Sequence, residues 1–136
     1  QHWSPGEHTG TFRGQGLSFV AGTEALSYFT DDSLMEQVRT RGERMRQRLR
    51  SLADARADHG WDVRGRGMMQ AVDVVDGAYA KDVQRECFER GLLIGPCGTG
   101  GRGIKLIPPL TIPDDDLDEG LDILAAAIDA TWKASA

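Results

Sequence analysis

Short apolar segments broken by glycines constrain the fold of this chain more than any other feature. Four such segments occur, at residues 61–63, 68–75, 92–94 and 104–107. Their β-branched and large apolar side chains, set between glycines and prolines, predict two pairs of strands. We expect residues 64–67, Arg-Gly-Arg-Gly, to form the turn of the first pair. The glycine-rich residues 96–103 would form a wide turn in the second.

Helical patterns separate and flank these pairs. Apolar side chains recur at spacings of three and four along residues 34–52, 79–87 and 117–132, which predicts three amphipathic helices. Ser33 and Glu36 form a capping-box pattern at the start of the first helix, and Gly91 has the position of a glycine that ends the second. The resulting order predicts an α+β fold, with a small mixed or antiparallel sheet covered by helices on one face.

An apolar segment and an arginine-rich helix remain to be interpreted. Residues 17–29 are mostly apolar or small, which predicts a buried helix. The first amphipathic helix carries many arginines, for which a solvated surface is the simplest interpretation. They are Arg39, Arg41, Arg44, Arg46, Arg48 and Arg50.

Composition excludes several classes of partner. The chain has 16 basic and 21 acidic residues, so its net charge of -5 argues against a nucleic-acid surface. No apolar run approaches the ~20 residues that span a bilayer, so we expect no membrane partner. Cys87 and Cys97 lack the spacing of a disulfide framework, which favours free thiols and the cytoplasm. The three histidines lack the ligand spacing of a zinc site, so no metal is predicted.

One segment carries the chemistry of a binding site. Residues 5–14, Pro-Gly-Glu-His-Thr-Gly-Thr-Phe-Arg-Gly, lead into the helix predicted over residues 17–29. Glycines allow backbone amides to approach an anion, threonine hydroxyls donate to phosphate oxygens, and a helix N-terminus adds partial positive charge. These properties predict a phosphate site. A loop that only caps the helix is the alternative.

The same segment resembles the class III aminotransferases, whose pattern matches His8 and Thr11-Phe12-Arg13-Gly14. Further motifs of that family are matched in their usual order by residues 63–69, 89–94, 105–112 and 117–124. The resemblance implies that residues 1–30 end the large, PLP-binding domain and that residues 31–136 are the C-terminal small domain of a fold-type I enzyme. The chain begins at Gln1 without a methionine, which we interpret as a truncated start.

The resemblance also implies roles for individual residues. Gly10 and Thr11 would bind the phosphate of pyridoxal 5'-phosphate (PLP) held by the neighbouring subunit of a homodimer or higher homo-oligomer. Lys105 stands where many members carry an arginine that holds the α-carboxylate of the substrate; its alternative role is a strand lysine that reaches solvent. The lysine that forms the Schiff base with PLP would lie upstream, since Lys81, Lys105 and Lys133 do not match its motif. We therefore predict no catalytic residue in this chain, and no activity from it alone.

The implied reaction passes an amino group between small amino and keto acids. Glutamate would be the donor and aspartate 4-semialdehyde the acceptor, giving 2,4-diaminobutyrate for ectoine biosynthesis. A different class III ω-amino-acid aminotransferase is one alternative. A non-catalytic α+β module that binds small molecules is another, because a fold alone does not determine a function.

Overall fold

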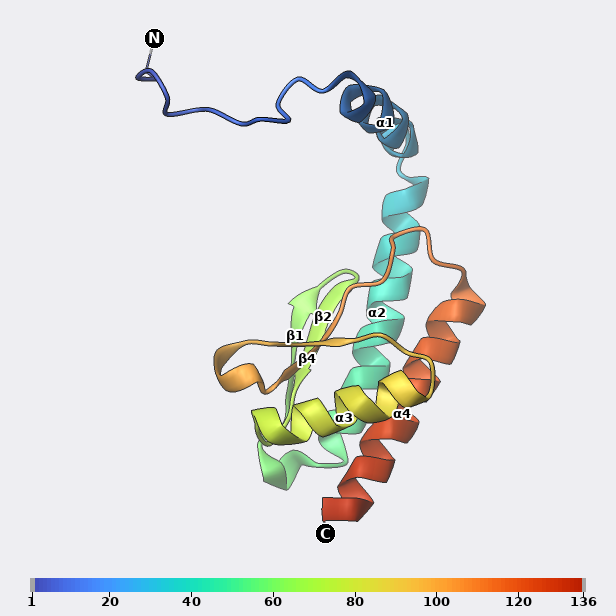
Figure 1. Ribbon diagram of the computed structural model, residues 1–136. Helices are drawn as coiled ribbons and strands as arrows, with labels where there is room; N and C mark the ends of the chain where they lie inside the picture. Colours follow the sequence, from blue (N-terminus) through green and yellow to red (C-terminus); the bar gives the residue numbers. More distant parts are fainter. Residues whose placement is uncertain (1, 136) are drawn as a thin grey trace. The chain divides into compact units, whose positions relative to one another are not determined.

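The computed structural model describes residues 2–135 and forms two compact units, one ending at Met35 and the other starting at Glu36. Gln1 and Ala136, the outer ends of the two predicted domains, lie outside the described residues. The first unit contains turns, helix α1 (Gly16–Leu26) and the 3-10 helix η1 (Ser27–Phe29) (Figure 1). Helix α2 (Ser33–Asp54) begins in the first unit and continues into the second.

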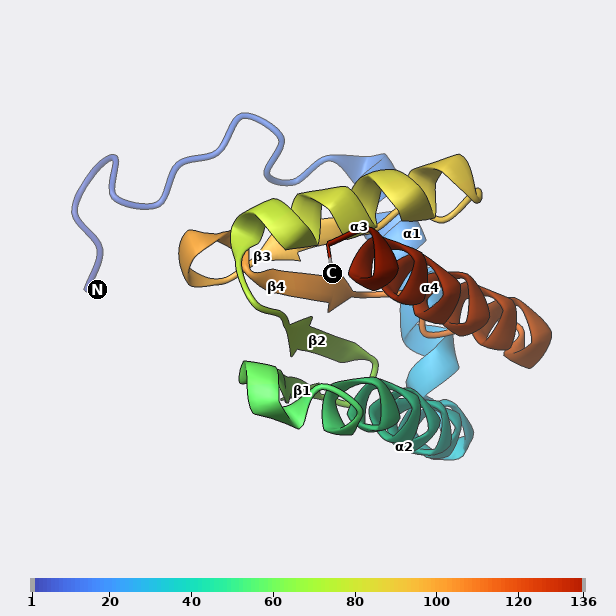
Figure 2. The ribbon, with the colours of Figure 1, turned by 90° about the horizontal axis from the view of Figure 1, so that it is seen from below.

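The second unit is a four-stranded antiparallel sheet with helices against it. Beyond α2, its elements are η2 (Ala57–His59), β1 (Asp62–Arg66), β2 (Met69–Asp73), α3 (Gly77–Glu89), β3 (Gly95–Cys97), η3 (Thr99–Gly101), β4 (Gly103–Leu106) and α4 (Asp114–Ser135). The strands lie in the order β1-β2-β4-β3, as Figure 2 shows. The predicted α+β fold and its three amphipathic helices are confirmed. Within residues 2–135, no helix is both long and apolar enough to cross a membrane.

The core lies between one face of this sheet and the helices. Val72 of β2 and Ile104 of β4 point into it and meet Leu49 of α2, Val83 of α3 and Leu124 of α4, each at most 1% exposed. Alternate residues of a strand point to opposite faces, so the intervening positions lie on the other face. That face is open, because Met69 of β2 is 61% exposed.

Charged side chains join α2 to α4 along one side of the unit. The pairs from α2 are Arg41 with Asp114, Arg44 with Asp118 and Arg48 with Asp122, and Arg56, just past the end of α2, pairs with Asp129. The partners advance together along both helices, so the helices run parallel, and we call this set the ion-pair ladder. The predicted solvated surface is confirmed for Arg48, which is exposed, but Arg41 is largely covered, with its side chain 12% exposed. The expectation considered one helix alone, whereas α4 carries aspartates at matching intervals.

The first hairpin turns later than predicted. Arg66 pairs with Met69, so the turn is Gly67-Met68, and Arg64-Gly65-Arg66 belong to β1. Gly65 has φ 125°, and a Cβ there would lie 2.2 Å from the carbonyl oxygen of Met69. A glycine is needed at Gly65 for this close strand pairing, not for a turn.

The strand predicted at residues 92–94 is also wrong, because β3 begins at Gly95. The Leu92 amide donates to the Cys87 carbonyl at 2.8 Å, and Gln84 Nε2 donates to the Ile94 carbonyl at 3.0 Å. Residues 92–94 therefore hydrogen-bond to α3 and do not pair with a strand of the sheet. Gly91, with φ 90°, ends α3 as predicted.

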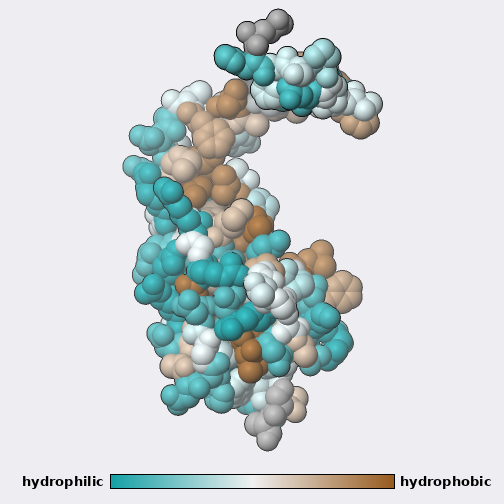
Figure 3. Space-filling model, turned by 90° about the vertical axis from the view of Figure 1, so that its left-hand side faces the viewer, coloured by the Kyte–Doolittle hydropathy of each residue, from teal (hydrophilic) through white to brown (hydrophobic). Residues whose placement is uncertain are grey.

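The N-terminal elements differ from prediction in two respects. Residues 17–29 are helical, but the helix is exposed in this chain: Leu17 is 78% and Val20 69% accessible. At the start of α2, the amide and hydroxyl of Ser33 hydrogen-bond Asp31, in place of the predicted exchange with Glu36. These bonds hold the pKa of the Asp31 carboxyl below its usual value. In Figure 3, hydrophobic surface gathers where α1 passes into α2.

Candidate functional site

The loop that precedes α1 is held by its own short-range contacts. The backbone amide of Ser4 donates to Glu7 Oε2 at 2.6 Å, and the Glu7 amide donates back to the Ser4 carbonyl at 3.1 Å. The rings of Trp3 and His8 lie 4.7 Å apart. Gly6, with φ 89°, permits the turn between Ser4 and Glu7. The Glu7 carboxylate therefore serves the turn itself.

Arg13 closes the next part of the loop around Thr11. Its Nη1 donates to the His8 carbonyl at 2.6 Å and its amide donates to the Gly10 carbonyl at 3.1 Å. Thr11 lies within this turn and is exposed. Its hydroxyl has no hydrogen-bond partner among residues 2–135, so it is available to a ligand.

The N-terminus of α1 follows directly and can accept negative charge. Gln15 occupies the N-cap position without a side-chain cap, and the first turn holds no acidic residue. The first amides of a helix lack intrahelical partners and carry partial positive charge. Thr11 therefore does not cap this helix, which removes the simpler role considered for it. The donors present, namely a hydroxyl, free amides and the charge of Arg13, fit a phosphate group.

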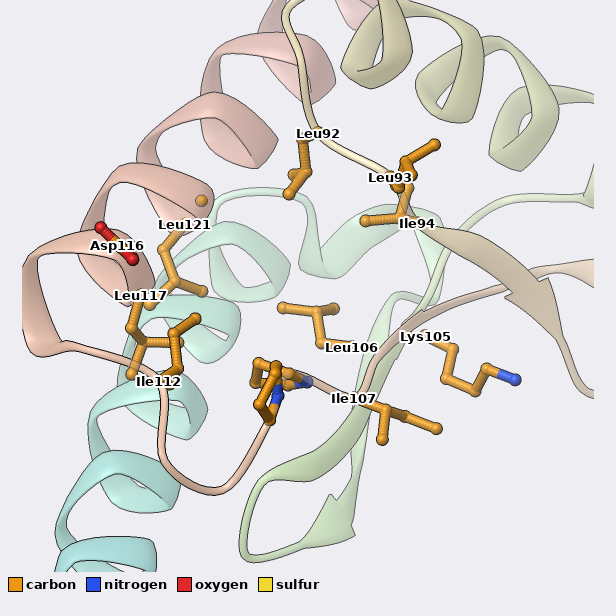
Figure 4. A pocket seen from close by; sticks show the side chains of 13 residues that line it. Leu92, Leu93, Ile94, Lys105, Leu106, Ile107, Ile112, Asp116, Leu117 and Leu121 are labelled. Carbon is orange, nitrogen blue, oxygen red and sulfur yellow. The ribbon is translucent and has the colours of Figure 1, made fainter.

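Lys105 lies in the second unit, on the open face of the sheet. It is an exposed residue of β4, with Ala71 of β2 and Gly95 of β3 as its neighbours in register. Both neighbours have small or absent side chains, so the lysine stem is not crowded from either side. Figure 4 shows the Lys105 ammonium pointing away from Leu106, which faces the apolar hollow beside α4.

A second cation occupies the same face. Arg64 of β1 pairs with Ala71, which in turn pairs with Lys105. Arg64 Nε donates to Asp73 Oδ2 at 3.1 Å, and its Nη2 donates to Asp73 Oδ1 at 3.1 Å and to Cys97 Sγ at 3.3 Å. The hydrogen bonds and charge of Asp73, and then the contact with Cys97, raise the pKa of the guanidinium above its already high value.

The two predicted free thiols lie in different surroundings. Cys97 is half-buried beside Arg64, whereas Cys87 is enclosed in the core. Burial raises the pKa of the Cys87 thiol to about 11, so this thiol stays protonated near neutral pH. Within residues 2–135, no group of three or more His, Cys, Asp or Glu side chains is placed to hold a metal ion.

An apolar hollow of about 290 Å³ lies between the end of β4 and α4. Its walls include Leu92, Ile94, Leu106, Leu117 and Leu121 (Figure 4). Its lining is mostly apolar, and Lys105 and Asp116 are the charged residues at it.

The structure brings some predicted site residues together and separates others. Gly10 and Thr11 belong to the first unit, and Lys105 belongs to the second. Sequence reasoning missed Arg64, because residues 64–67 were taken for a turn. Two arginines separated by one residue in a strand share a face, so placing the turn at Gly67-Met68 would have exposed this signal.

Comparisons with known proteins give a consistent result. A family model described as Aminotransferase class-III matches residues 1–128. An uncharacterized aminotransferase of Sinorhizobium fredii is 43% identical over 95% of this chain and 29% of its own length. A diaminobutyrate–2-oxoglutarate transaminase of Wolinella succinogenes is 41% identical over 93% of this chain and 30% of its own. This chain thus spans less than a third of these relatives.

Solved structures agree with the fold. The ornithine aminotransferase from Toxoplasma gondii superimposes with a TM-score of 0.80 and 30% identity, covering 97% of this chain and 31% of that one. A phospholyase from Arthrobacter, solved with phosphoethanolamine, gives a TM-score of 0.73 at 27% identity, over 83% of this chain and 28% of that one. Both are similar to this chain over a part of their length only.

Proposed function

This chain belongs to the class-III aminotransferase family, and we propose that it is the C-terminal part of a PLP-dependent transaminase. The superposition of this chain on part of the Toxoplasma gondii ornithine aminotransferase supports this proposal. In the intact enzyme, residues 1–30 would complete the large PLP-binding domain and residues 31–136 would form the small domain.

The loop around Thr11 carries this proposal. Gly10 and Thr11 would bind the PLP phosphate, with the hydroxyl donating to a phosphate oxygen and the glycine allowing a close backbone approach. The uncapped α1 N-terminus would add its partial positive charge. When bound, PLP supplies the electron sink that amino transfer requires. In a homodimer or higher oligomer, this loop would reach the cofactor of the neighbouring subunit.

Lys105 is the residue we propose to hold the α-carboxylate of the substrate. Its ammonium stands on the open face of the sheet with Ala71 and Gly95 beside it, so a carboxylate can approach. A lysine offers a single rotating charge, whereas an arginine would grip the carboxylate with two parallel hydrogen bonds. The orientation of the substrate should therefore depend on further contacts.

The proposed reaction moves an amino group from glutamate to aspartate 4-semialdehyde, giving 2,4-diaminobutyrate. Several relatives at 35–42% identity are named diaminobutyrate–2-oxoglutarate transaminases, which supports this choice. We further propose that the enzyme acts in the cytoplasm, in ectoine biosynthesis. A class III aminotransferase for another ω-amino acid is the second candidate, because the S. fredii relative is named only as an uncharacterized aminotransferase.

The intact enzyme would also need a lysine to bind PLP covalently. Lys81 on α3, Lys105 on β4 and Lys133 on α4 do not stand in the family's lysine motif. We propose that another part of the polypeptide provides it, so that residues 1–136 alone are inactive. A coupled glutamate assay showing PLP-dependent turnover by this chain alone would contradict that part of the proposal.

Replacement of Thr11 tests the phosphate contact. A hydrogen bond to a charged acceptor contributes about 1.5–3 kcal/mol, so Thr11→Ala in the complete enzyme should weaken PLP binding by about 10- to 150-fold. Thr11→Ser retains the hydroxyl and should bind nearly normally. Cofactor titration of the folded enzyme measures both. Unchanged affinity in Thr11→Ala would refute the contact.

A mixed dimer tests which subunit provides it. One subunit carries Thr11→Ala, and the other lacks the PLP-binding lysine. If the contact crosses the interface, the only lysine-bearing site receives Thr11 from its partner and binds PLP normally. Weak binding in this mixed dimer would place the contact within one subunit.

A further inference from the structure

The open face of the sheet carries two cations on one row of neighbouring residues. Arg64 of β1, Ala71 of β2 and Lys105 of β4 stand side by side in register. Two inter-strand spacings separate the outer Cα atoms, about 10 Å in all. Since residues in register point to the same face of a sheet, the arginine and the lysine flank the methyl group of Ala71.

The burial of Ala71 indicates how these side chains lie. Ala71 is only 3% exposed, although it points away from the helix-covered core. Arg64 and Lys105 are its neighbours across the sheet, and the long stems of such residues commonly lie over apolar surface. The stems therefore help to cover Ala71, while the Arg64 guanidinium reaches the neighbouring row of Asp73, Gly103 and Cys97.

The Arg64 guanidinium lies in a socket formed by Gly98, Gly103, Asp73 and Cys97. A Cβ on Gly98 would lie 2.8 Å from Arg64 Nη2, and a Cβ on Gly103 would also lie 2.8 Å from it. These glycines leave the space that the guanidinium fills between β1 and β4. Asp73 and Cys97 then fix its Nε and Nη2 atoms.

The Nη1 group of Arg64 remains available. It has no hydrogen-bond partner among residues 2–135, and the side chain is 47% exposed. An arginine whose other atoms are fixed loses little conformational freedom when it binds a carboxylate. Asp73 offsets part of the charge of Arg64, so the Lys105 ammonium provides the net positive charge on this row.

We propose that Arg64 and Lys105 together form a two-cation site that selects a dicarboxylic acid. This rests on the proposed function, in which Lys105 binds the α-carboxylate and Arg64 Nη1 receives the distal carboxylate. Glutamate and 2-oxoglutarate have two carboxylates to span the row, whereas 2,4-diaminobutyrate has only one. Arg64 is thus a specificity-determining residue for the dicarboxylic partner of the reaction.

Kinetics of the complete enzyme test this assignment. Arg64→Gln should raise KM for glutamate and for 2-oxoglutarate by about 10- to 150-fold, the loss expected for a hydrogen bond to a charged group. KM for 2,4-diaminobutyrate should stay within about threefold, well below the effect of one such bond. An equal rise in KM for all three compounds, or no rise for any, would overturn the proposal.

Two variants separate direct contact from other effects. Arg66→Gln removes a neighbouring cation of β1 from the same face and should leave KM for glutamate unchanged, whereas a general field effect would alter both variants alike. Asp73→Asn weakens the socket but retains the guanidinium. If Arg64 were only a structural brace, Asp73→Asn would reproduce the discrimination pattern of Arg64→Gln, and the proposal would be wrong.

A binding experiment on residues 1–136 does not depend on transaminase activity. Glutarate should shift the side-chain NMR signals of both Arg64 and Lys105 and should bind more tightly than butyrate, which has one carboxylate. Equal binding of the two acids would refute the two-cation site even in an active enzyme. A complete enzyme without transaminase activity, together with selective glutarate binding here, would instead refute the proposed function alone.

Discussion

The two compact units differ in how far along the chain their contacts reach. Among residues 2–33, which are all exposed, the side-chain hydrogen bonds join groups at most five residues apart. In the second unit, the ion-pair ladder joins residues 73 or 74 positions apart, and five helices and strands meet in one core. Local bonds shape a segment, but burial stabilises it. The first unit therefore has a defined shape without an interior of its own.

Apolar surface in the first unit has a direct interpretation. Phe12, Leu17, Phe19 and Val20 are each at least 65% exposed. Contiguous apolar exposure of this kind usually marks a lost or unfilled interface. Because the chain spans less than a third of its relatives, we propose that the remainder of the polypeptide covers this surface.

Hydrogen exchange should reveal the largest difference between the units. An isolated helix as short as α1 is marginal in water, so amides of Leu17–Leu26 should exchange almost without protection. Amides of Leu121–Ile128 in α4 should open only with the whole unit, orders of magnitude more slowly. Strong protection over residues 17–29 in a monomeric sample would remove the contrast.

Truncation of matched leucines should give the next largest effect. Leu124 is fully buried, so Leu124→Ala should lower the free energy of unfolding by about 2–5 kcal/mol. Leu17 is 78% exposed, so Leu17→Ala should change it by less than about 0.5 kcal/mol. Chemical denaturation of the chain measures both. A comparable loss in the two variants would show that α1 has a packing partner.

Features set by contacts between residues close in sequence could be predicted from the sequence, and features set by distant contacts could not. Helical periodicity located α2, α3 and α4 because it is a local pattern, and Gly91 marked the end of α3 for the same reason. Register depends on which strands pair, so the turn at Gly67-Met68 and the start of β3 at Gly95 were missed. Arg64 was missed as a site residue through the same error.

The loop around Thr11 shows the opposite case. Its glycines, threonines and following helix predicted donors for an anion, and the structure places the Thr11 hydroxyl in the open. The burial of α1 could not be judged from periodicity, because an apolar helix has the same pattern whether its cover lies in this chain or elsewhere.

The smallest expected effect is the loss of stability in acid as the carboxylates of the ion-pair ladder become protonated. The Arg41 hydrogen bond, and then the charges of Arg41 and Arg44, lower the pKa of the Asp114 carboxyl. Its stabilising contribution is therefore present above its ordinary pKa of 3.8 and is lost as the pH falls through the lower value in the folded state. Asp114→Asn should reduce the acid dependence of stability measured below about pH 4.

Asp115→Asn provides the control for this measurement. Asp115 lies in the same first turn of α4 and shares its favourable interaction with the helix N-terminus, but it forms no ion pair within residues 2–135. The acid dependence should change less in this variant. Equal changes in both would assign the effect to the helix terminus and not to the ladder.

The regular offset of the ladder also limits how this region can vary in length during evolution. Three pairs join α2 to α4, and a fourth joins Arg56, just past the end of α2, to α4; each spans 73 or 74 residues. A one-residue insertion inside either helix would rotate everything beyond it by about 100° and carry the later partners away from each other. An insertion between residues 98 and 102, outside both helices, would leave every pair facing its partner. Natural insertions and deletions should therefore accumulate in such loops, and both helices should keep their lengths.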